Sequence, residues 1–184
     1  MSFAKSFEQL LRDESVTLSN GKFDRGGVTF AGITRKNFPD WNGWAFLDAT
    51  PQNQEMAIFW TKDFYQKWWA SLSLDTFGSD EVANSLFSYS VNAGVTQAVK
   101  DLQRACNYVA FCTHANPFKT IAEDGKPGKN TLAALNHLHL MGLDKELLRE
   151  YGARKTIFRT RLILNDKTQL ANCLGWARRD MGCV

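Results

Sequence analysis

The sequence predicts a mainly α-helical protein with one small β-hairpin near its N-terminus. Apolar residues recur at helical spacing along most of the chain, whereas extended and glycine-rich residues gather only between residues 16 and 34. The chain has 184 residues, of which 44% are hydrophobic and 22% are charged. This length and composition suffice for a hydrophobic core without disulfide bonds, and they argue against disorder.

The N-terminal part is predicted to hold a helix, a hairpin and a second, longer helix. The first helix is expected to end near residue 14 and has one apolar face, formed by Phe3, Phe7, Leu10 and Leu11. A β-ribbon is expected over residues 16–34, because Gly and Asn tolerate the positive φ of tight turns, and residues 39–44 are expected to connect it onward. Thr50 and Pro51 predict the start of a helix that runs to about residue 72. Its inward face is expected to be Met56, Phe59, Trp60, Phe64 and Trp68.

The remaining elements are predicted to be helices. Ser79 is expected to cap a helix that Gly94 ends, and Thr96 is expected to cap the next one. That next helix has an apolar face formed by Val99, Leu102, Cys106 and Val109. A loop over residues 112–129 is expected to lead into helices at about 130–140, 144–164 and 167–180.

Charge and hydropathy exclude several classes of protein. The net charge is +3 and the isoelectric point is about 8.7, far below the basic load of a dedicated nucleic-acid binder. No apolar stretch approaches the roughly 20 residues of a membrane-spanning helix, so no stable membrane insertion is expected. The first residues lack the charged and apolar regions of a secretory signal. We expect a monomer that is made in the cytoplasm.

No metal ion or cofactor is expected. His137 and His139 lie two residues apart on a predicted helix and so point to different faces. The chain contains no phosphate-binding loop and no zinc-protease motif. Its cysteines are too few and too scattered for a disulfide framework. Cys106 and Cys112 are close enough in sequence to pair if oxidised; otherwise they are inert thiols.

Glu14, Asp24 and Thr29 are the candidate catalytic residues. Hydrolysis of a sugar polymer needs one carboxylic acid that protonates the leaving oxygen, and a second polar or acidic group that handles water or the cationic transition state. Glu14 ends a predicted helix, and the other two residues follow on the glycine-rich ribbon that faces it. Ordinary surface charge and an ordinary turn would give the same spacing, so the pattern by itself leaves both interpretations open.

The segment from Glu14 to Thr34 resembles the signature of glycoside hydrolase family 108, a lysozyme-like N-acetylmuramidase family of phage endolysins and secretion-assisting muramidases. The resemblance rests on Glu14 followed by the Asp24–Thr34 stretch, DRGGVTFAGIT, although the Glu-to-Asp interval is ten residues here where nine is expected. Residues 86–94 resemble the second helix end of the family. Residues 102–105, with Asp124, Gly125, Gly128 and Thr131, and the late residues 174–178 resemble its C-terminal part, which is described as a peptidoglycan-binding domain.

The resemblance implies a lysozyme-like helical fold and cleavage of the β-1,4 bond between N-acetylmuramic acid and N-acetylglucosamine. It implies that Glu14 is the catalytic acid and that Asp24 and Thr29 complete the site. Gly27 is expected to let the glycan approach the turn. Tyr89 and Asn92 are expected to touch sugar, with core packing an equal alternative for Tyr89. The alternatives in function are a lytic transglycosylase and a non-catalytic cell-wall-binding protein.

The resemblance also implies a domain organisation, a partner and a place of action. A catalytic region over residues 1–95 and a helical region over residues 96–184 are expected to pack as one unit. Peptidoglycan glycan strands are the expected partner. The expected site of action is the cell wall, in the periplasm of a Gram-negative host, reached through a holin or a dedicated secretion route.

Overall fold

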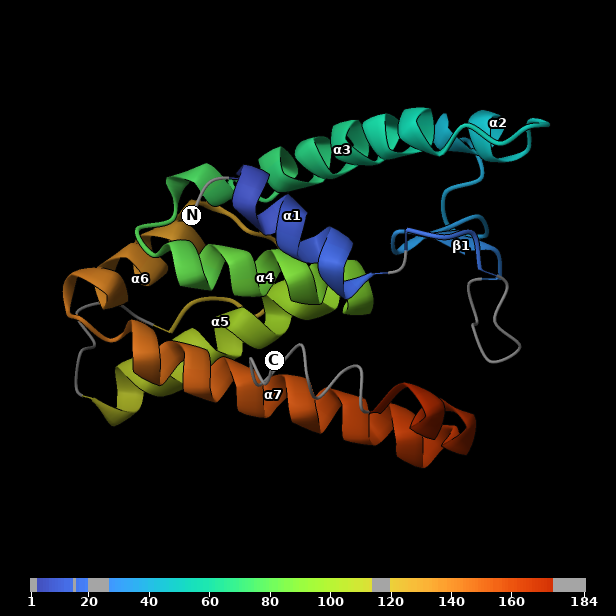
Figure 1. Cartoon of the computed structure of the whole chain (residues 1–184). Helices are drawn as coiled ribbons and strands as arrows, with labels where there is room; N and C mark the ends of the chain where they lie inside the picture. The colour runs from blue at the N-terminus through green and yellow to red at the C-terminus, as the bar shows by residue number, and fades with distance from the viewer. Residues whose placement is uncertain (1–2, 15, 20–26, 114–119, 174–184) are drawn as a thin grey trace. The chain divides into compact units, whose positions relative to one another are not determined.

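The computed structural model describes residues 3–14, 16–19, 27–113 and 120–173, and it confirms a mainly α-helical, lysozyme-like fold with one small antiparallel hairpin (Figure 1). Contacts within the chain divide it into two compact units, residues 2–72 and residues 73–184, which we call the N-terminal unit and the C-terminal unit. The boundary expected between residues 95 and 96 falls inside the C-terminal unit. Among the described helices, none is long and apolar enough to cross a membrane.

The N-terminal unit consists of α1 (Phe3–Asp13), β1 (Thr29–Phe30), β2 (Ile33–Thr34), α2 (Gly43–Leu47) and α3 (Gln54–Ser71). The first helix ends where the sequence predicted. Its apolar face packs on α3 through aromatic rings, with Phe7 6.4 Å from Tyr65 and Phe3 5.9 Å from Trp69 between ring centroids. These contacts fix the end of α1, where Glu14 follows.

Three predictions for this unit are wrong in detail. The helix α3 begins at Gln54, because the side chain of Asn53 accepts the N–H of Met56 and caps it, so Thr50 and Pro51 precede the helix. Part of the predicted connector forms the short helix α2. The buried face of α3 is the stripe formed by Ala57, Thr61, Tyr65 and Trp69, whereas Phe59 is 59% exposed.

The α3 face was mispredicted because aromatic residues surround this helix. When apolar side chains occupy several sides, periodicity alone does not identify the side that a neighbour covers. The buried stripe includes Thr61, a polar residue whose hydroxyl donates a 2.8 Å hydrogen bond to the carbonyl oxygen of Ala57. That local bond satisfies the hydroxyl and lets it lie in the core.

The C-terminal unit is a helical bundle around α5. It consists of the 3-10 helix η1 (Leu74–Thr76), α4 (Asp80–Ala93), α5 (Val95–Cys112), α6 (Lys129–Leu140), α7 (Asp144–Asn165) and the 3-10 helix η2 (Lys167–Asn172). The central helix α5 contacts α4, α6 and α7 (Figure 1). Its predicted apolar face is confirmed, since Val99, Leu102, Cys106 and Val109 are all buried.

Most of the helix caps and helix ends that the sequence predicts for this unit are confirmed. The Ser79 side chain accepts the N–H of Val82 and caps α4, and Gly94 ends that helix with a φ of 82°. Thr96 does not cap α5, because Gly94 itself precedes the first residue of that helix. The last predicted helix is a 3-10 helix over residues 167–172, and its remainder lies outside the described residues. Cys106 and Cys112 lie on the same helix and are both free thiols.

Candidate active site

Glu14 immediately follows α1 and is partly buried. Its backbone N–H donates a 2.8 Å hydrogen bond to the carbonyl oxygen of Leu10, which continues the helical bonding by one residue. Its side chain lies close enough to Tyr65 to act on it electrostatically. Burial raises the pKa of the Tyr65 hydroxyl well above its ordinary value, and the negative charge of Glu14 raises it further. The charge of the candidate acid therefore acts on a buried tyrosine of α3.

The same tyrosine holds the hairpin. The Tyr65 hydroxyl donates a 2.8 Å hydrogen bond to the carbonyl oxygen of Ala31, in the turn between β1 and β2. Ala31 and Gly32 both have positive φ, 47° and 78°, as expected for a two-residue hairpin turn that matches the twist of its strands. Ala31 is fully buried, and the register pairs Phe30 with Ile33.

Thr29 is the first residue of β1. Its backbone exchanges two hydrogen bonds with Ser19, of 2.8 and 2.9 Å, which tie the strand to the segment that follows α1. Its hydroxyl donates a 3.2 Å hydrogen bond to the carbonyl oxygen of Gly27. Gly27 has a φ of 70°, where a side chain is disfavoured. The structure thus places Glu14, Gly27 and Thr29 in one unit, and Asp24 lies outside the described residues.

Tyr89 and Asn92 lie in the C-terminal unit, on α4. Tyr89 is 1% exposed, its hydroxyl donates a 3.0 Å hydrogen bond to Asp101, and its ring packs edge-on against Tyr151. Such a ring has no open face for a sugar, so Tyr89 packs in the core, the alternative that the sequence left open. Asn92 is exposed, and its amide donates a 3.1 Å hydrogen bond to the carbonyl oxygen of Ser88.

Residues 7–94 match the family model described as Glycosyl hydrolase 108. This region belongs to glycoside hydrolase family 108. The match includes all six candidate site residues: Glu14, Asp24, Gly27, Thr29, Tyr89 and Asn92. The chain therefore contains a glycoside hydrolase domain. The resemblance to this family that we inferred from the sequence is confirmed.

The fold of the chain is also similar to a solved structure, that of SagA from Brucella abortus. The TM-score is 0.68 at 24% sequence identity, and the likeness covers 97% of this chain and 89% of the SagA chain. At that identity the comparison supports the fold alone. No curated protein sequence matches the chain.

Beyond the matched region, the C-terminal motif forms a buried hydrogen-bond centre on Gln103. Its amide nitrogen donates to Asp124, to the carbonyl oxygen of Lys126 and to Thr131, at 2.9, 3.1 and 3.1 Å. Its amide oxygen accepts the N–H of Gly125 at 2.9 Å. The hydrogen bond from Gln103 also contributes most to lowering the pKa of Asp124. The motif thus fastens the loop before α6 to α5, and the role that the structure gives these residues is architectural.

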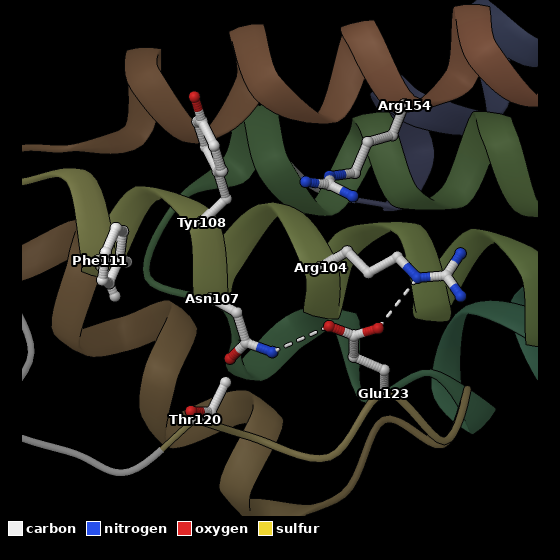
Figure 2. Close-up of a pocket in the computed structure, with 8 residues that line it drawn as sticks. Arg104, Asn107, Tyr108, Phe111, Thr120, Glu123 and Arg154 are labelled. Carbon is white, nitrogen blue, oxygen red and sulfur yellow. Dashed lines mark hydrogen bonds and ion pairs between the residues drawn. The ribbon is translucent and has the colours of Figure 1, made fainter.

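A groove of about 380 Å³ opens on the C-terminal unit beside α5 (Figure 2). Figure 2 shows Arg104 and Asn107 directed at Glu123, with N–O distances of 3.0 and 3.3 Å. Arg154, from α7, pairs with Glu150 at 2.7 Å. The charged groups of this groove are therefore already paired with one another or with neighbouring side chains.

The described residues were also compared with the requirements of a metal centre. Within residues 3–14, 16–19, 27–113 and 120–173, no group of three or more His, Cys, Asp or Glu side chains is placed to hold a metal ion. The residue that sequence reasoning missed is Tyr65, which is not part of the inward face expected for α3. The only feature that could have pointed to Tyr65 is that it shares one face of α3 with Ala57, Thr61 and Trp69, which are buried.

Proposed function

We propose that this chain is a peptidoglycan hydrolase that cleaves the β-1,4 bond between N-acetylmuramic acid and N-acetylglucosamine. The observation that carries the proposal is the position of Glu14. Within a glycoside hydrolase domain, this carboxyl group lies at the end of a helix, beside Tyr65, whose hydroxyl holds the hairpin that bears Thr29. Glycan hydrolysis needs a carboxylic acid that protonates the leaving oxygen, and this position supports Glu14 in that role.

In the proposed reaction, Glu14 gives its proton to the glycosidic oxygen as the bond from that oxygen to the anomeric carbon breaks. Asp24 stabilises the positive charge that develops on the sugar or positions the attacking water. The Thr29 hydroxyl orients that water. The water adds its oxygen to the anomeric carbon and gives its proton to a carboxylate of the site, either Asp24 or the Glu14 that has just lost its own proton. The products are two shorter glycan strands, one with a new reducing end.

A turbidity assay on cells stripped of their outer membrane tests the role of Glu14. Glu14→Gln is nearly isosteric but cannot donate a titrating proton, so we expect lysis to slow about 10²-fold or more with unchanged thermal unfolding. Glu8→Gln is the matched control, because Glu8 is an exposed carboxylate on α1. A folded Glu14→Gln variant with wild-type lysis would remove Glu14 from the mechanism.

Product analysis separates the proposal from its alternatives. A hydrolase releases strands with reducing ends, whereas a lytic transglycosylase leaves 1,6-anhydro ends and uses no water. A wall-binding protein without catalysis would release neither, and Glu14→Gln would leave its biological effect intact. We propose peptidoglycan glycan strands as the substrate and the cell wall as the place of action, in the periplasm of a Gram-negative host. A holin or a dedicated secretion route would give the enzyme access to it.

A further inference from the structure

A second groove lies within the N-terminal unit, between residues 37–42 and one face of α3 at residues 60–67. Its volume is about 350 Å³, at the lower end of the range of roughly 300–1,000 Å³ for small-molecule sites. Glu14, Gly27 and Thr29 do not line it. It therefore differs from the candidate active site in both its residues and its chemistry.

The floor of this groove is aromatic and held in place. Phe38 meets Phe64 edge-on, with 4.9 Å between ring centroids, and Trp60 lines the same surface. The indole N–H of Trp41 donates a 3.3 Å hydrogen bond to the carbonyl oxygen of Trp60. A Cβ atom at Gly43 would overlap the Trp41 indole, so this glycine lets the ring approach the backbone of α2 closely. Aromatic rings that are held in this way offer faces on which the C–H groups of a sugar can pack. Binding then costs little side-chain entropy.

The rim of the groove carries polar side chains that have no partner in the described part of the chain. Asn37, Asp40 and Asn42 come from the segment before α2, and the Asn42 side chain does not cap that helix. The opposite rim carries Asp63 and Lys67, which form a 2.8 Å ion pair. Two amides and a carboxylate beside an aromatic floor supply hydrogen-bond donors and acceptors for hydroxyl and acetamido groups. In the groove beside α5, by contrast, the charged groups are engaged with protein partners.

The net charge of the residues that line the groove favours uncharged sugars over negatively charged ones. Asp40 and Asp63 contribute two negative charges and Lys67 one positive charge, which leaves a formal charge of −1. A like charge on a ligand is disfavoured at such a site. The free lactyl carboxylate of peptide-free N-acetylmuramic acid would meet this field, whereas N-acetylglucosamine is uncharged.

We propose that this groove is an accessory binding site for an uncharged N-acetylhexosamine unit of a glycan, N-acetylglucosamine in the cell wall. The inference rests on the proposed function, because a cell-wall glycan is the source of such a sugar. A site of this kind would hold a part of the strand that is not being cleaved, and would lower KM for long strands without changing the chemical step.

Nuclear magnetic resonance on the full chain tests the proposal directly. Isotope-labelled Glu14→Gln protein, which is expected not to cleave its ligand, is titrated with a tetramer of N-acetylglucosamine. We expect the indole N–H signals of Trp41 and Trp60 and the amide signals of residues 37–42 to shift. Shifts confined to residues around Glu14 and the hairpin would overturn the proposal.

Variants of the polar rim give a second readout. Asn37→Ala, Asp40→Ala and Asn42→Ala, combined in the Glu14→Gln background, should raise the Kd for the tetramer about tenfold or more. Thermal unfolding should stay unchanged, because these side chains hold no hydrogen bonds within the described residues. The matched control in the same background combines Glu8→Ala and Gln66→Ala, an exposed acid and an exposed amide outside the groove. Equal affinity of the rim variant and the control would contradict the proposal.

The failure of this inference and that of the proposed function are distinguishable. In one outcome, the wild-type protein releases no peptidoglycan fragments, but the tetramer still shifts the resonances of the groove residues. That outcome would refute the proposed hydrolase activity and support the accessory binding site. Hydrolysis without any shift in the groove would refute the site alone. A peptide-free disaccharide that carries N-acetylmuramic acid should bind the groove more weakly than the N-acetylglucosamine dimer. Equal or tighter binding would contradict the charge argument.

Discussion

The hydroxyl of Tyr65 donates a 2.8 Å hydrogen bond to the carbonyl oxygen of Ala31. Ala31 has a φ of 47°, which a residue with a side chain rarely adopts, and it is fully buried in the hairpin turn. Tyr65 also lies in the field of Glu14. One side chain of α3 thus holds an unfavourable backbone turn and borders the candidate acid, so it links the two parts of the proposed site.

Tyr65→Phe should therefore affect both stability and catalysis. Removing the hydroxyl leaves a buried carbonyl oxygen without its donor, which costs about 1–3 kcal/mol in the free energy of unfolding. We expect kcat to fall as well, because the hairpin that bears Thr29 loses an anchor. Urea unfolding and the turbidity assay measure the two effects.

Tyr151→Phe is the matched control, since the Tyr151 hydroxyl donates a 3.0 Å hydrogen bond to the carbonyl oxygen of Ala98 in the C-terminal unit. It should cost similar stability and leave kcat unchanged. Equal loss of kcat in both variants would show that the effect on catalysis is a general consequence of reduced stability.

Asp24 and Thr29 should differ in their kinetic effects. If Asp24 stabilises charge in the transition state or positions water, Asp24→Asn lowers kcat more than it raises KM. Thr29→Ala should do less harm, because another water can partly replace a hydroxyl that only orients water. Steady-state kinetics on soluble peptidoglycan fragments measure both. An inactive Thr29→Ala beside a fully active Asp24→Asn would show that the two roles are reversed.

Gly125→Ala should destabilise the C-terminal unit. Its φ is 77°, and a Cβ atom would lie 2.8 Å from both the backbone oxygen and the methyl carbon of Thr96, so the loop that Gln103 holds would have to shift. We expect a loss of about 1–3 kcal/mol in the free energy of unfolding. Gly152→Ala is the control, because a Cβ atom there meets nothing within 4 Å inside α7. Alanine at that helical position should stabilise the protein by about 0.5–1 kcal/mol. A neutral Gly125→Ala would contradict the packing argument.

Stability should fall at alkaline pH, in part through Cys106. Burial raises the pKa of the Cys106 thiol from its ordinary value of 9.0 to about 12. The folded chain therefore keeps a proton that the unfolded chain loses, so the contribution is complete below pH 9 and is lost as the pH rises toward 12. The slope from this single group is about 1.4 kcal/mol per pH unit.

Urea unfolding at several pH values checks the Cys106 prediction. Cys106→Ala should remove that part of the slope, whereas Cys112→Ala, which deletes an exposed thiol from the same helix, controls for the loss of a cysteine. An unchanged slope in Cys106→Ala would assign the alkaline loss to other groups, and the buried Tyr65 hydroxyl, whose pKa is also raised, is the next candidate.

Local chemistry determined much of this protein. The Ser79 side chain accepts the N–H of Val82, Gly94 has a positive φ, and α5 has one apolar face. Each of these features depends on a few neighbouring residues, and each was predictable from the sequence. The same holds for Glu14 at the end of α1 and for the hairpin glycines, because helix ends and tight turns have strong residue preferences.

The tertiary structure alone decided which of several apolar faces is buried. The sequence of α3 offers aromatic residues on more than one side, and only the packing of α1 and the hairpin determines that Tyr65 and Trp69 lie inside while Phe59 stays exposed. Tyr89 likewise packs in the core because Asp101 and Tyr151, distant in sequence, meet it there. The groove beside Trp41 also depends on long-range packing of the segment before α2 against α3. Hydrophobic periodicity shows how apolar each face of a helix is. Which face is buried depends on the shape of the neighbouring elements that cover it.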